Sequence, residues 1–343
     1  MIGVLRGLGL LFGLLAVLVL TLAAFGLPII PSLQLIAEGA FSDKFAWART
    51  GVKMTPLLLV GLGMVMAWRA GVYNIGGEGQ YVVGAIAGAA VARLILNVNP
   101  AGTLPGASIF VLFGCVVGGA GWALLAGWLY VRRGVEIVIS TILLNFIAIQ
   151  LLGWVVSGPL QEAKRSVPQT DLVPKAMLMP KFDRQLDVNA GVILAVLLAA
   201  AATVFLYRTT EGYRLRLVGE NPRVATVNYI RADWVQLRAM AMSGALCGLA
   251  GGVEYLGLVG QLGTTFPQQW GFLGIPVALL GALNPIGTLA SAFFFGAMFA
   301  GTENLARFSA SGSTIVYVIQ AMAVLAYVAL DQRRRRKAAK GDN

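Results

Sequence analysis

The sequence has no histidine, only two cysteines and few charged residues. Without histidine the chain lacks the commonest general base and metal ligand, which argues against hydrolytic or metal-dependent chemistry. Cys115 and Cys247 lie far apart within apolar runs, so we expect two buried thiols instead of a disulfide or a metal pair. Charged residues form 12% of the chain, about half the usual share. A soluble protein of this length needs more of them on its surface.

Apolar residues and glycine fill most of what remains. Hydrophobic residues form 58% of the 343 residues, 43 more are glycine, and the mean hydropathy is +0.78. No soluble fold of this size has enough interior to bury so much apolar surface. The composition therefore predicts an all-α, polytopic transmembrane helical bundle and excludes a soluble enzyme.

The net charge of +11 is concentrated in two short segments. Arg208–Arg238 contains six arginines and three acidic residues, and the tail Asp331–Asn343 contains six basic and two acidic residues. Both segments adjoin apolar spans, which is typical of the cytoplasmic side of a membrane protein. This placement predicts membrane lipids as the surroundings of the chain and argues against a nucleic-acid partner.

A helix that crosses the bilayer needs about 20 apolar residues. The chain has ten candidate crossings: Leu8–Ile30, Met54–Ala70, Gly79–Leu96, Ala107–Val131, Glu136–Ser157, Asn189–Tyr207, Trp234–Val259, Gly271–Leu283, Thr288–Leu305 and Thr314–Leu330. A cleaved signal peptide is the alternative for the first, but its apolar stretch is longer than that of a signal sequence. Ten crossings place both termini on the same side, which the arginine-rich segments identify as cytoplasmic.

We expect a single transmembrane domain over residues 1–343, built from two half-repeats of inverted topology. Its predicted parts are the first crossing and an interfacial helix (1–53), the first half-repeat (54–157), an extracytoplasmic loop of balanced charge (158–188, the outer loop below), a cytoplasmic coupling loop (208–233), the second half-repeat (234–330) and a basic cytoplasmic tail (331–343).

Two segments rich in glycine and amide side chains interrupt the apolar pattern at comparable places in the two halves. The first is Asn74–Gln80 and the second is Gly260–Gly274. Paired breaks of this kind are a strong sequence pointer to a transport path, because lipid cannot satisfy the open backbone groups of a broken helix. An ordinary turn at the headgroup level is the alternative. The residues predicted to line the path are Asn74, Gly76, Gly77, Glu78, Gln80, Gln261 and Asn284.

Glu78 is the most informative of these residues, because an acidic group near the membrane interior is costly and is usually functional. Arg69 is its nearest possible counter-ion along the chain. We expect backbone N–H groups or Arg69 to hold Glu78 in a structural role, with direct substrate binding as the alternative. Asn74 and Gln80, with Gln261 opposite, would then offer hydrogen bonds to a neutral substrate.

The chain lacks the phosphate-binding G-x-x-x-x-G-K-[ST] sequence. A transporter without that sequence uses either an ion gradient or an ATPase on another chain. The coupling loop contains Asn221-Pro222, which is typical of the start of a helix. A short charged helix between two spans suits the docking of a soluble partner, and an unstructured loop is the alternative.

Four motifs carry a resemblance to a known family. They are Y-N-I-G-G-E-G-Q at Tyr73–Gln80, G-E-N-P at Gly219–Pro222, S-G-A-L-C-G-L-A-G-G-V-E at Ser243–Glu254 and G-F-L-G-I-P-V-A-L-L-G at Gly271–Gly281. In this order they resemble the permease subunit of bacterial ATP-binding-cassette importers, in the branched-chain amino acid/ribose permease family. The resemblance covers residues 50–330 and is strongest to the branch for nucleosides and simple sugars.

The resemblance implies a transport subunit of the bacterial cytoplasmic (inner) membrane that performs no covalent chemistry and binds no cofactor. ATP would bind to separate ATPase subunits, a second permease subunit would complete a homo- or heterodimer, and an extracytoplasmic binding protein or lipoprotein would deliver the substrate. The residues implied to couple to the ATPase are Gly219, Glu220, Asn221, Pro222, Arg223 and Ala225. The chain departs from the family at Tyr73, where phenylalanine is common, and at Tyr229, where glycine is common.

Two other function classes compete with this prediction. An ion-coupled secondary transporter would use Glu78 or Glu254 as its proton or cation site, and an intramembrane enzyme would need an acid pair or a histidine motif. The motif of the coupling loop favours the importer over both. Among substrates the resemblance favours a nucleoside over a simple sugar.

Overall fold

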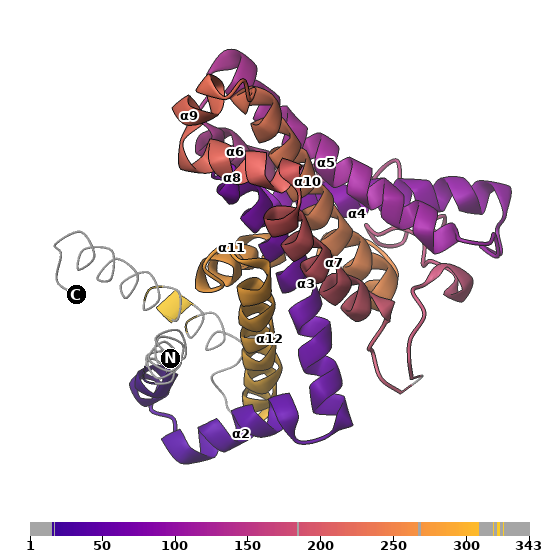
Figure 1. The fold of residues 1–343 in the computed structure, drawn as a ribbon. Coiled ribbons are helices and arrows are strands. Elements are labelled where there is room, and N and C mark those ends of the chain that lie inside the picture. The colour runs from indigo at the N-terminus through magenta and orange to yellow at the C-terminus, as the bar shows by residue number, and fades with distance from the viewer. Residues whose placement is uncertain are drawn as a thin grey trace. The chain divides into compact units, whose positions relative to one another are not determined.

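The computed structural model describes residue 16, residues 18–183, 185–266 and 269–308, and residues 318, 321, 322 and 325. Over these residues the fold is helical, and its only β-type pairings are two isolated bridges. Seven of the described helices are long and apolar enough to cross a membrane. The prediction of an all-α, polytopic transmembrane bundle is therefore confirmed (Figure 1).

The helices follow one another along the chain with short connections, apart from the outer loop. In chain order they are α2 (Ile29–Phe41), α3 (Lys44–Arg69), α4 (Gly77–Val98), α5 (Ala107–Arg133), α6 (Ile137–Val156), the short 3₁₀ helix η1 (Lys175–Met177), α7 (Ala190–Arg208), α8 (Thr210–Glu220), α9 (Pro222–Val227), α10 (Ala232–Glu254), the π-helical turn η2 (Tyr255–Val259), α11 (Trp270–Leu280) and α12 (Pro285–Phe308).

Seven of the ten predicted crossings correspond to the seven spanning helices, with α10 and η2 forming one span. The predicted crossing Gly271–Leu283 is the 11-residue helix α11. At about 1.5 Å per residue α11 is too short to span the roughly 30 Å hydrocarbon core. Residues 8–15 and 17 of the predicted crossing Leu8–Ile30, most of Thr314–Leu330 and the basic tail 331–343 lie outside the described residues.

The structure differs from the predicted boundaries near the N-terminus. The chain turns at Gly26, where φ is 68°, and a new helix begins at Ile29. Helix α3 begins at Lys44, whereas the apolar run begins at Met54. Asp43 caps α3 because its carboxylate accepts a hydrogen bond from Ala46 N at 2.7 Å. Hydropathy therefore locates the membrane-spanning part of α3, whereas its capping residue decides where the helix begins.

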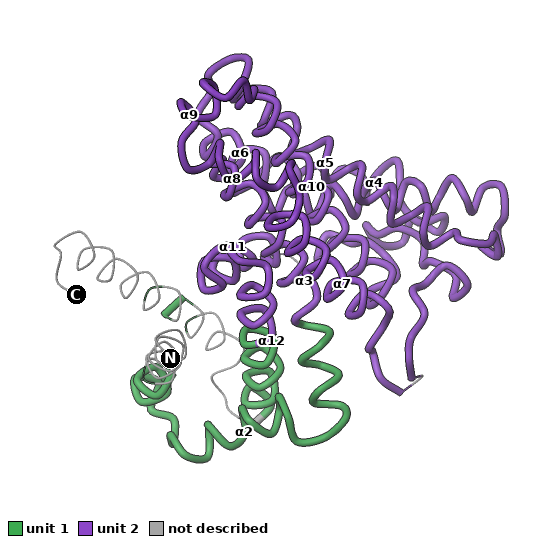
Figure 2. Tube along the Cα trace, viewed as in Figure 1, with its two compact units in different colours: residues 1–53, 294–343 green, residues 54–293 purple. Residues whose placement is uncertain are grey.

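The chain forms two compact units, residues 1–53 with 294–343 (unit 1) and residues 54–293 (unit 2) (Figure 2). In unit 1, Leu18 and Leu22 pack with Ile36 and Leu305 in a small apolar core. In the same unit Lys53 Nζ lies 2.5 Å from Glu303 Oε1. All the residues of the predicted path and of the coupling segment belong to unit 2.

Unit 2 is built around α4, α5 and α10, which contact one another through glycines. A Cβ added to Gly84 or Gly119 would overlap the backbone of α10 at Gly248, and one on Gly244 would overlap the backbone of α5. Small residues allow helix backbones to approach this closely in a membrane. Gly121 on α5 is the contrasting case, because none of the described residues lies within 4 Å of its added Cβ.

Candidate functional site

The first break, between α3 and α4, is organised around the buried amide of Asn74. Its Nδ2 donates to Gln80 Oε1 at 3.0 Å and to Ser243 Oγ at 2.9 Å. Its Oδ1 accepts hydrogen bonds from Gly76 N at 2.8 Å and from Gln80 Nε2 at 3.1 Å. Two predicted path residues, Asn74 and Gln80, therefore form a reciprocal amide pair, and Ser243 joins the pair to α10.

Helix α6 supplies the partners for the backbone of the first break. Asn145 Oδ1 accepts from Gly79 N at 2.8 Å, and Asn145 Nδ2 donates to Ile75 O at 2.9 Å. Thr141, one turn earlier on the same helix face, accepts from Ile75 N at 3.3 Å. Because these side chains replace the missing helical partners, the irregular backbone is satisfied within the protein, as it must be at membrane depth.

Glu78 joins the first break to the helix that follows the second break. Its carboxylate is fully buried and accepts hydrogen bonds from Gln269 N at 2.7 Å and from Gly271 N at 2.8 Å. These N–H groups belong to the N-terminal end of α11, where a helix leaves donors unpaired and favours negative charge. Glu78 also lies in the first turn of α4, so the ends of two helices stabilise the same carboxylate.

The segments on either side of this contact approach closely. A Cβ on Gly271 would overlap the backbone of Glu78, so only glycine fits there. The ring of Phe266, in the second break, stacks on Tyr81 of α4 with centroids 5.5 Å apart. The two breaks therefore meet in space, as the sequence predicts. That they line one shared cavity stays a prediction.

The second break, between α10 and α11, begins with the π-helical turn η2 and Gly260, whose φ is 74°. Its backbone pairs with the outer loop. Thr170 N donates to Leu262 O at 2.8 Å and Val173 N donates to Gly260 O at 2.9 Å. Thr170 Oγ1 accepts from Leu262 N at 3.0 Å. The outer loop therefore provides the partners that a spanning helix provides at the first break.

The structure does not bring the remaining path residues to Asn74. Gln261 Nε2 donates to Gln169 Oε1 of the outer loop at 3.2 Å. Asn284 caps α12 through a hydrogen bond from Ile286 N at 2.9 Å, and its Nδ2 donates to Tyr207 at 3.2 Å. Two hollows of unit 2, with volumes of about 570 Å³ and 230 Å³, are lined by other residues.

Arg69 does not serve as the partner of Glu78 in the bonds described above. Its Nε donates to Leu283 O at 2.8 Å. Of the two partners expected for Glu78, the structure therefore shows the backbone N–H groups.

The coupling loop folds into α8 and α9, which lie at one end of α10 (Figure 1). Asn221 Oδ1 accepts from Arg223 N at 3.0 Å and from Val224 N at 3.1 Å, and Pro222 occupies the first position of α9. The predicted helix start at Asn221-Pro222 is therefore confirmed. Glu220 is exposed, whereas Ala225 is fully buried.

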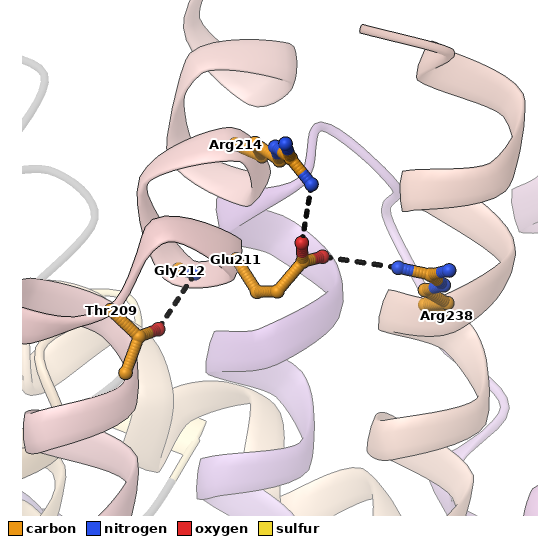
Figure 3. A network of polar contacts seen from close by, with 5 residues as sticks. All are labelled: Thr209, Glu211, Gly212, Arg214 and Arg238. Carbon is orange, nitrogen blue, oxygen red and sulfur yellow. Dashed lines mark hydrogen bonds and ion pairs between the residues drawn. The ribbon is translucent and has the colours of Figure 1, made fainter.

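Ion pairs tie α8 to the spanning helix that follows. Glu211 lies 2.6 Å from Arg214 within α8 and 3.1 Å from Arg238 on α10. Thr209 Oγ1 caps the same helix by accepting from Gly212 N at 3.1 Å (Figure 3). Because Glu211 bridges two helices, α8 is held to α10 on this side.

The end of α8 rests directly on the first break. A Cβ added to Gly219 would overlap the carbonyl of Arg69 and lie 2.9 Å from Gly71 N. Gly71, whose φ is 75°, turns the chain out of α3. The coupling segment is therefore in backbone contact with the turn that leads from α3 into the first break, which neither motif reveals by itself.

Two of these residues, Ser243 and Thr170, escaped sequence reasoning about the path. Ser243 and Thr170 carry no local signal, because hydroxyl groups are common in helices and loops. Asn145 does carry one, since it is an amide within the otherwise apolar run Ile137–Val156. That signal indicates an interhelical hydrogen bond but does not identify Gly79 and Ile75 as the partners.

Comparison with known proteins gives the family context of this arrangement. The family model described as "branched-chain amino acid transport system / permease component" matches residues 48–327. The glucose ABC transporter permease protein TsgB13 of Haloferax volcanii is 30% identical, over 83% of this chain and 76% of the relative. The guanosine ABC transporter permease protein NupP of Bacillus subtilis is also 30% identical, over 84% and 82%. The nucleoside ABC transporter permease protein NupB of Lactococcus lactis is 28% identical, over 74% and 71%.

Proposed function

Because the chain belongs to the family of branched-chain amino acid transport system permease components, we propose that it forms the membrane path for nucleosides or simple sugars. It is a multi-pass transport subunit of the ATP-binding-cassette class. An ion-coupled transporter is not favoured. The substrate, the path and the docking of the ATPase form the proposal.

The proposed assembly follows the family. ATPase subunits hydrolyse ATP on the cytoplasmic side, a second permease subunit completes the path, and an extracytoplasmic binding protein or lipoprotein delivers the substrate. Residues 54–157 and 234–330 are the two half-repeats, and both termini face the cytoplasm of a bacterial inner membrane. The two arginine-rich segments support this orientation.

The backbone contact between Gly219 and Arg69–Gly71 carries the mechanism. In our proposal the ATPase docks on Gly219–Ala225 and moves α8 when it binds and hydrolyses ATP. Gly219 contributes no side chain to absorb the displacement at this contact. The shift reaches Glu78, which holds the N-terminus of α11 beyond the second break.

The chemistry of the path residues supports a neutral, hydroxyl-bearing substrate. Asn74 and Gln80 satisfy each other in this structure, and an amide pair of this kind can exchange partners for ribose, base or sugar groups without unpaired charge. Gln261 and Asn284 offer further amides in the same half of the chain as the second break. The names of the relatives, which include guanosine, nucleoside and glucose permeases, point to the same chemical classes.

The contacts of Glu78 speak against an ion-coupled mechanism through that residue. Both of its carboxylate oxygens accept backbone N–H groups, which stabilise the charged form at a helix N-terminus. A proton or cation site would need this carboxylate to exchange its partner during transport, and the end of α11 would then lose its cap.

The coupling proposal is tested by a matched pair of glycine substitutions. Gly219→Ala places a methyl group against the backbone of the first break, whereas Gly121→Ala places one in open space. In proteoliposomes with its ATPase and binding protein, Gly219→Ala should hydrolyse ATP with little uptake, and Gly121→Ala should keep both activities. Normal coupled uptake by Gly219→Ala would contradict the proposal.

The substrate proposal is tested by competition. Uptake of a labelled nucleoside and of a labelled hexose is measured against unlabelled nucleosides, hexoses, nucleoside monophosphates and branched-chain amino acids. We expect nucleosides or hexoses to compete and nucleoside monophosphates to fail, because the path residues offer amides without cations. Transport of branched-chain amino acids alone would overturn the substrate class but not the importer mechanism.

A further inference from the structure

The turn that ends α9 holds a tyrosine in a backbone conformation that suits glycine. Tyr229 has φ of 58°, its N donates to Thr226 O at 3.0 Å, and Ile230 N donates to Ala225 O at 2.9 Å. These two bonds form the helix-ending turn in which glycine is usual at the left-handed position. Any side chain with a Cβ is disfavoured there.

The side chain of Tyr229 is not buried against the described part of the chain. It is 97% exposed. In the part of the chain that the structure describes, no hydrogen bond from its hydroxyl and no ring stacking of its phenol is found. A residue that strains the backbone and packs on none of the described residues suits a contact outside its own chain.

The neighbours of Tyr229 have the composition of a protein-docking surface. Val224 and Val227 on α9 are 43% and 79% exposed, and Arg223 and Arg231 flank them in exposed positions. We name these five residues the α9 face. Aromatic residues, arginine and exposed aliphatic groups are typical of the centres of protein interfaces.

A hollow adjoins the α9 face. It has a volume of about 570 Å³ and is lined by Tyr229, Arg231 and Trp234, together with Arg214 and Arg238. One acid, Glu211, also lines it and pairs with Arg214 and Arg238. Tyr229 therefore protrudes beside a basic hollow, which complements the acidic rim of a pocket on a folded partner.

We propose that Tyr229 anchors the ATPase subunit by inserting its ring into an apolar pocket with an acidic rim on that subunit. The inference rests on the proposed function, because it takes the α9 face as part of the ATPase docking site. It adds that the backbone strain at Tyr229, in the turn after α9, is retained because the side chain strengthens binding to the partner. Tyr229 thus acts as a specificity residue for the choice of ATPase.

The test uses the opposite effects that one substitution should have on folding and on assembly. Tyr229→Gly relieves the backbone strain, so the melting temperature of the detergent-solubilised permease should rise by a few degrees. The same variant should bind the purified ATPase subunit of its transporter at least about tenfold more weakly, as expected when an interface anchor is lost. Tyr229→Phe should keep the wild-type melting temperature and nearly the wild-type affinity.

Tyr213→Ala is the control, because Tyr213 on α8 is also exposed but lies outside the α9 face. It should leave ATPase affinity unchanged. If Tyr229→Gly binds the ATPase as tightly as the wild type does, the anchor is wrong while the proposed function stands. If the wild-type permease does not bind the ATPase, the proposed function fails together with the anchor. A loss of binding to anionic vesicles, with ATPase affinity unchanged, would identify a lipid surface as the occupant and overturn the inference.

Discussion

The break between α3 and α4 and the break between α10 and α11 both leave backbone groups without helical partners, and the two breaks recruit partners from different places. Asn145 and Thr141 on the spanning helix α6 serve the first break. Thr170 and Val173 of the outer loop serve the second. The first break is therefore fixed by side chains of a spanning helix, whereas the second is fixed by buried groups of the loop between α6 and α7.

This difference assigns different tasks to the two breaks. A segment held by a spanning helix opens only at the cost of unsatisfied polar groups, whereas one paired with an interhelical loop can keep its partners if that loop moves with it. A binding protein that docks outside would reach the outer loop first. On this view the second break responds to substrate delivery, and the first transmits the motion of the ATPase.

The largest expected effect comes from Asn145→Leu, which removes the side-chain hydrogen bonds that α6 makes to the first break. It leaves Gly79 N and Ile75 O buried without partners, at a cost of about 1–3 kcal/mol for each group. Thermal unfolding in detergent should show a strongly destabilised protein. Gln150→Leu, at an exposed position on the same helix, is the control and should melt near the wild type. Equal melting temperatures for the two variants would refute the role of Asn145.

Glu78→Gln tests the link between the breaks and should cost less, on the order of 2 kcal/mol. The amide keeps one oxygen for α11 but turns an NH₂ group toward the other backbone donor. Uptake should fall while the ratio of rates for two competing substrates stays constant, because Glu78 holds structure without touching substrate. A changed substrate ratio with an unchanged melting temperature would make Glu78 a direct ligand instead.

Thr170→Val probes the second break, with an expected cost of about 1 kcal/mol. Valine keeps the shape of threonine but cannot accept the hydrogen bond from Leu262 N. Because the outer loop should act on transport more than on stability, stimulation by the binding protein should change while the melting temperature moves little. Thr103→Val, at an exposed position before α5, is the control. Unchanged stimulation would separate the outer loop from gating.

The smallest effect concerns the pH response of the outer loop. The hydrogen bond from Gln169, with those from Val167 N and Ser166 N, holds the pKa of Glu162 below its usual value. The contribution of Glu162 is therefore present above the unfolded pKa of about 4.3 and is lost as the pH falls through the lower folded pKa. Hydrogen exchange of the Ser166 and Val167 amides should quicken in that acidic window, beyond the intrinsic pH dependence. Glu162→Gln should remove this step, and a step that persists in the variant would assign it to another group.

Local features of the site could be predicted from the sequence, because their causes are local. Asn221-Pro222 starts α9 because Asn221 Oδ1 accepts hydrogen bonds from Arg223 N and Val224 N. Glu78 is identifiable as a special residue because a buried acid needs compensation. Its partners are not, since Gln269 and Gly271 lie more than 190 residues further along the chain. Sequence proximity suggested Arg69, which bonds to Leu283 O instead.

The fold shows the same division. Hydropathy located the seven spanning helices, because the bilayer imposes length and composition on them. It did not reveal that Gln261 bonds to Gln169 of the outer loop, because the loop's path depends on tertiary contacts. The start of α3 at Lys44 likewise depended on the cap from Asp43, which hydropathy does not register.

The glycine contacts among α4, α5 and α10 limit how a transport cycle can move this subunit. Where Gly119 faces Gly244 and Gly248 with no room for a methyl group, the backbones interlock and one helix cannot slide or rotate past another without collision. We therefore expect α4, α5 and α10 to move as one rigid body. We expect the backbone rotations of a transport cycle to occur at two hinges, the chain segments around Gly71 and Gly260, where φ is positive. A crosslink between two of these three helices should leave uptake intact, whereas one across either hinge should stop it.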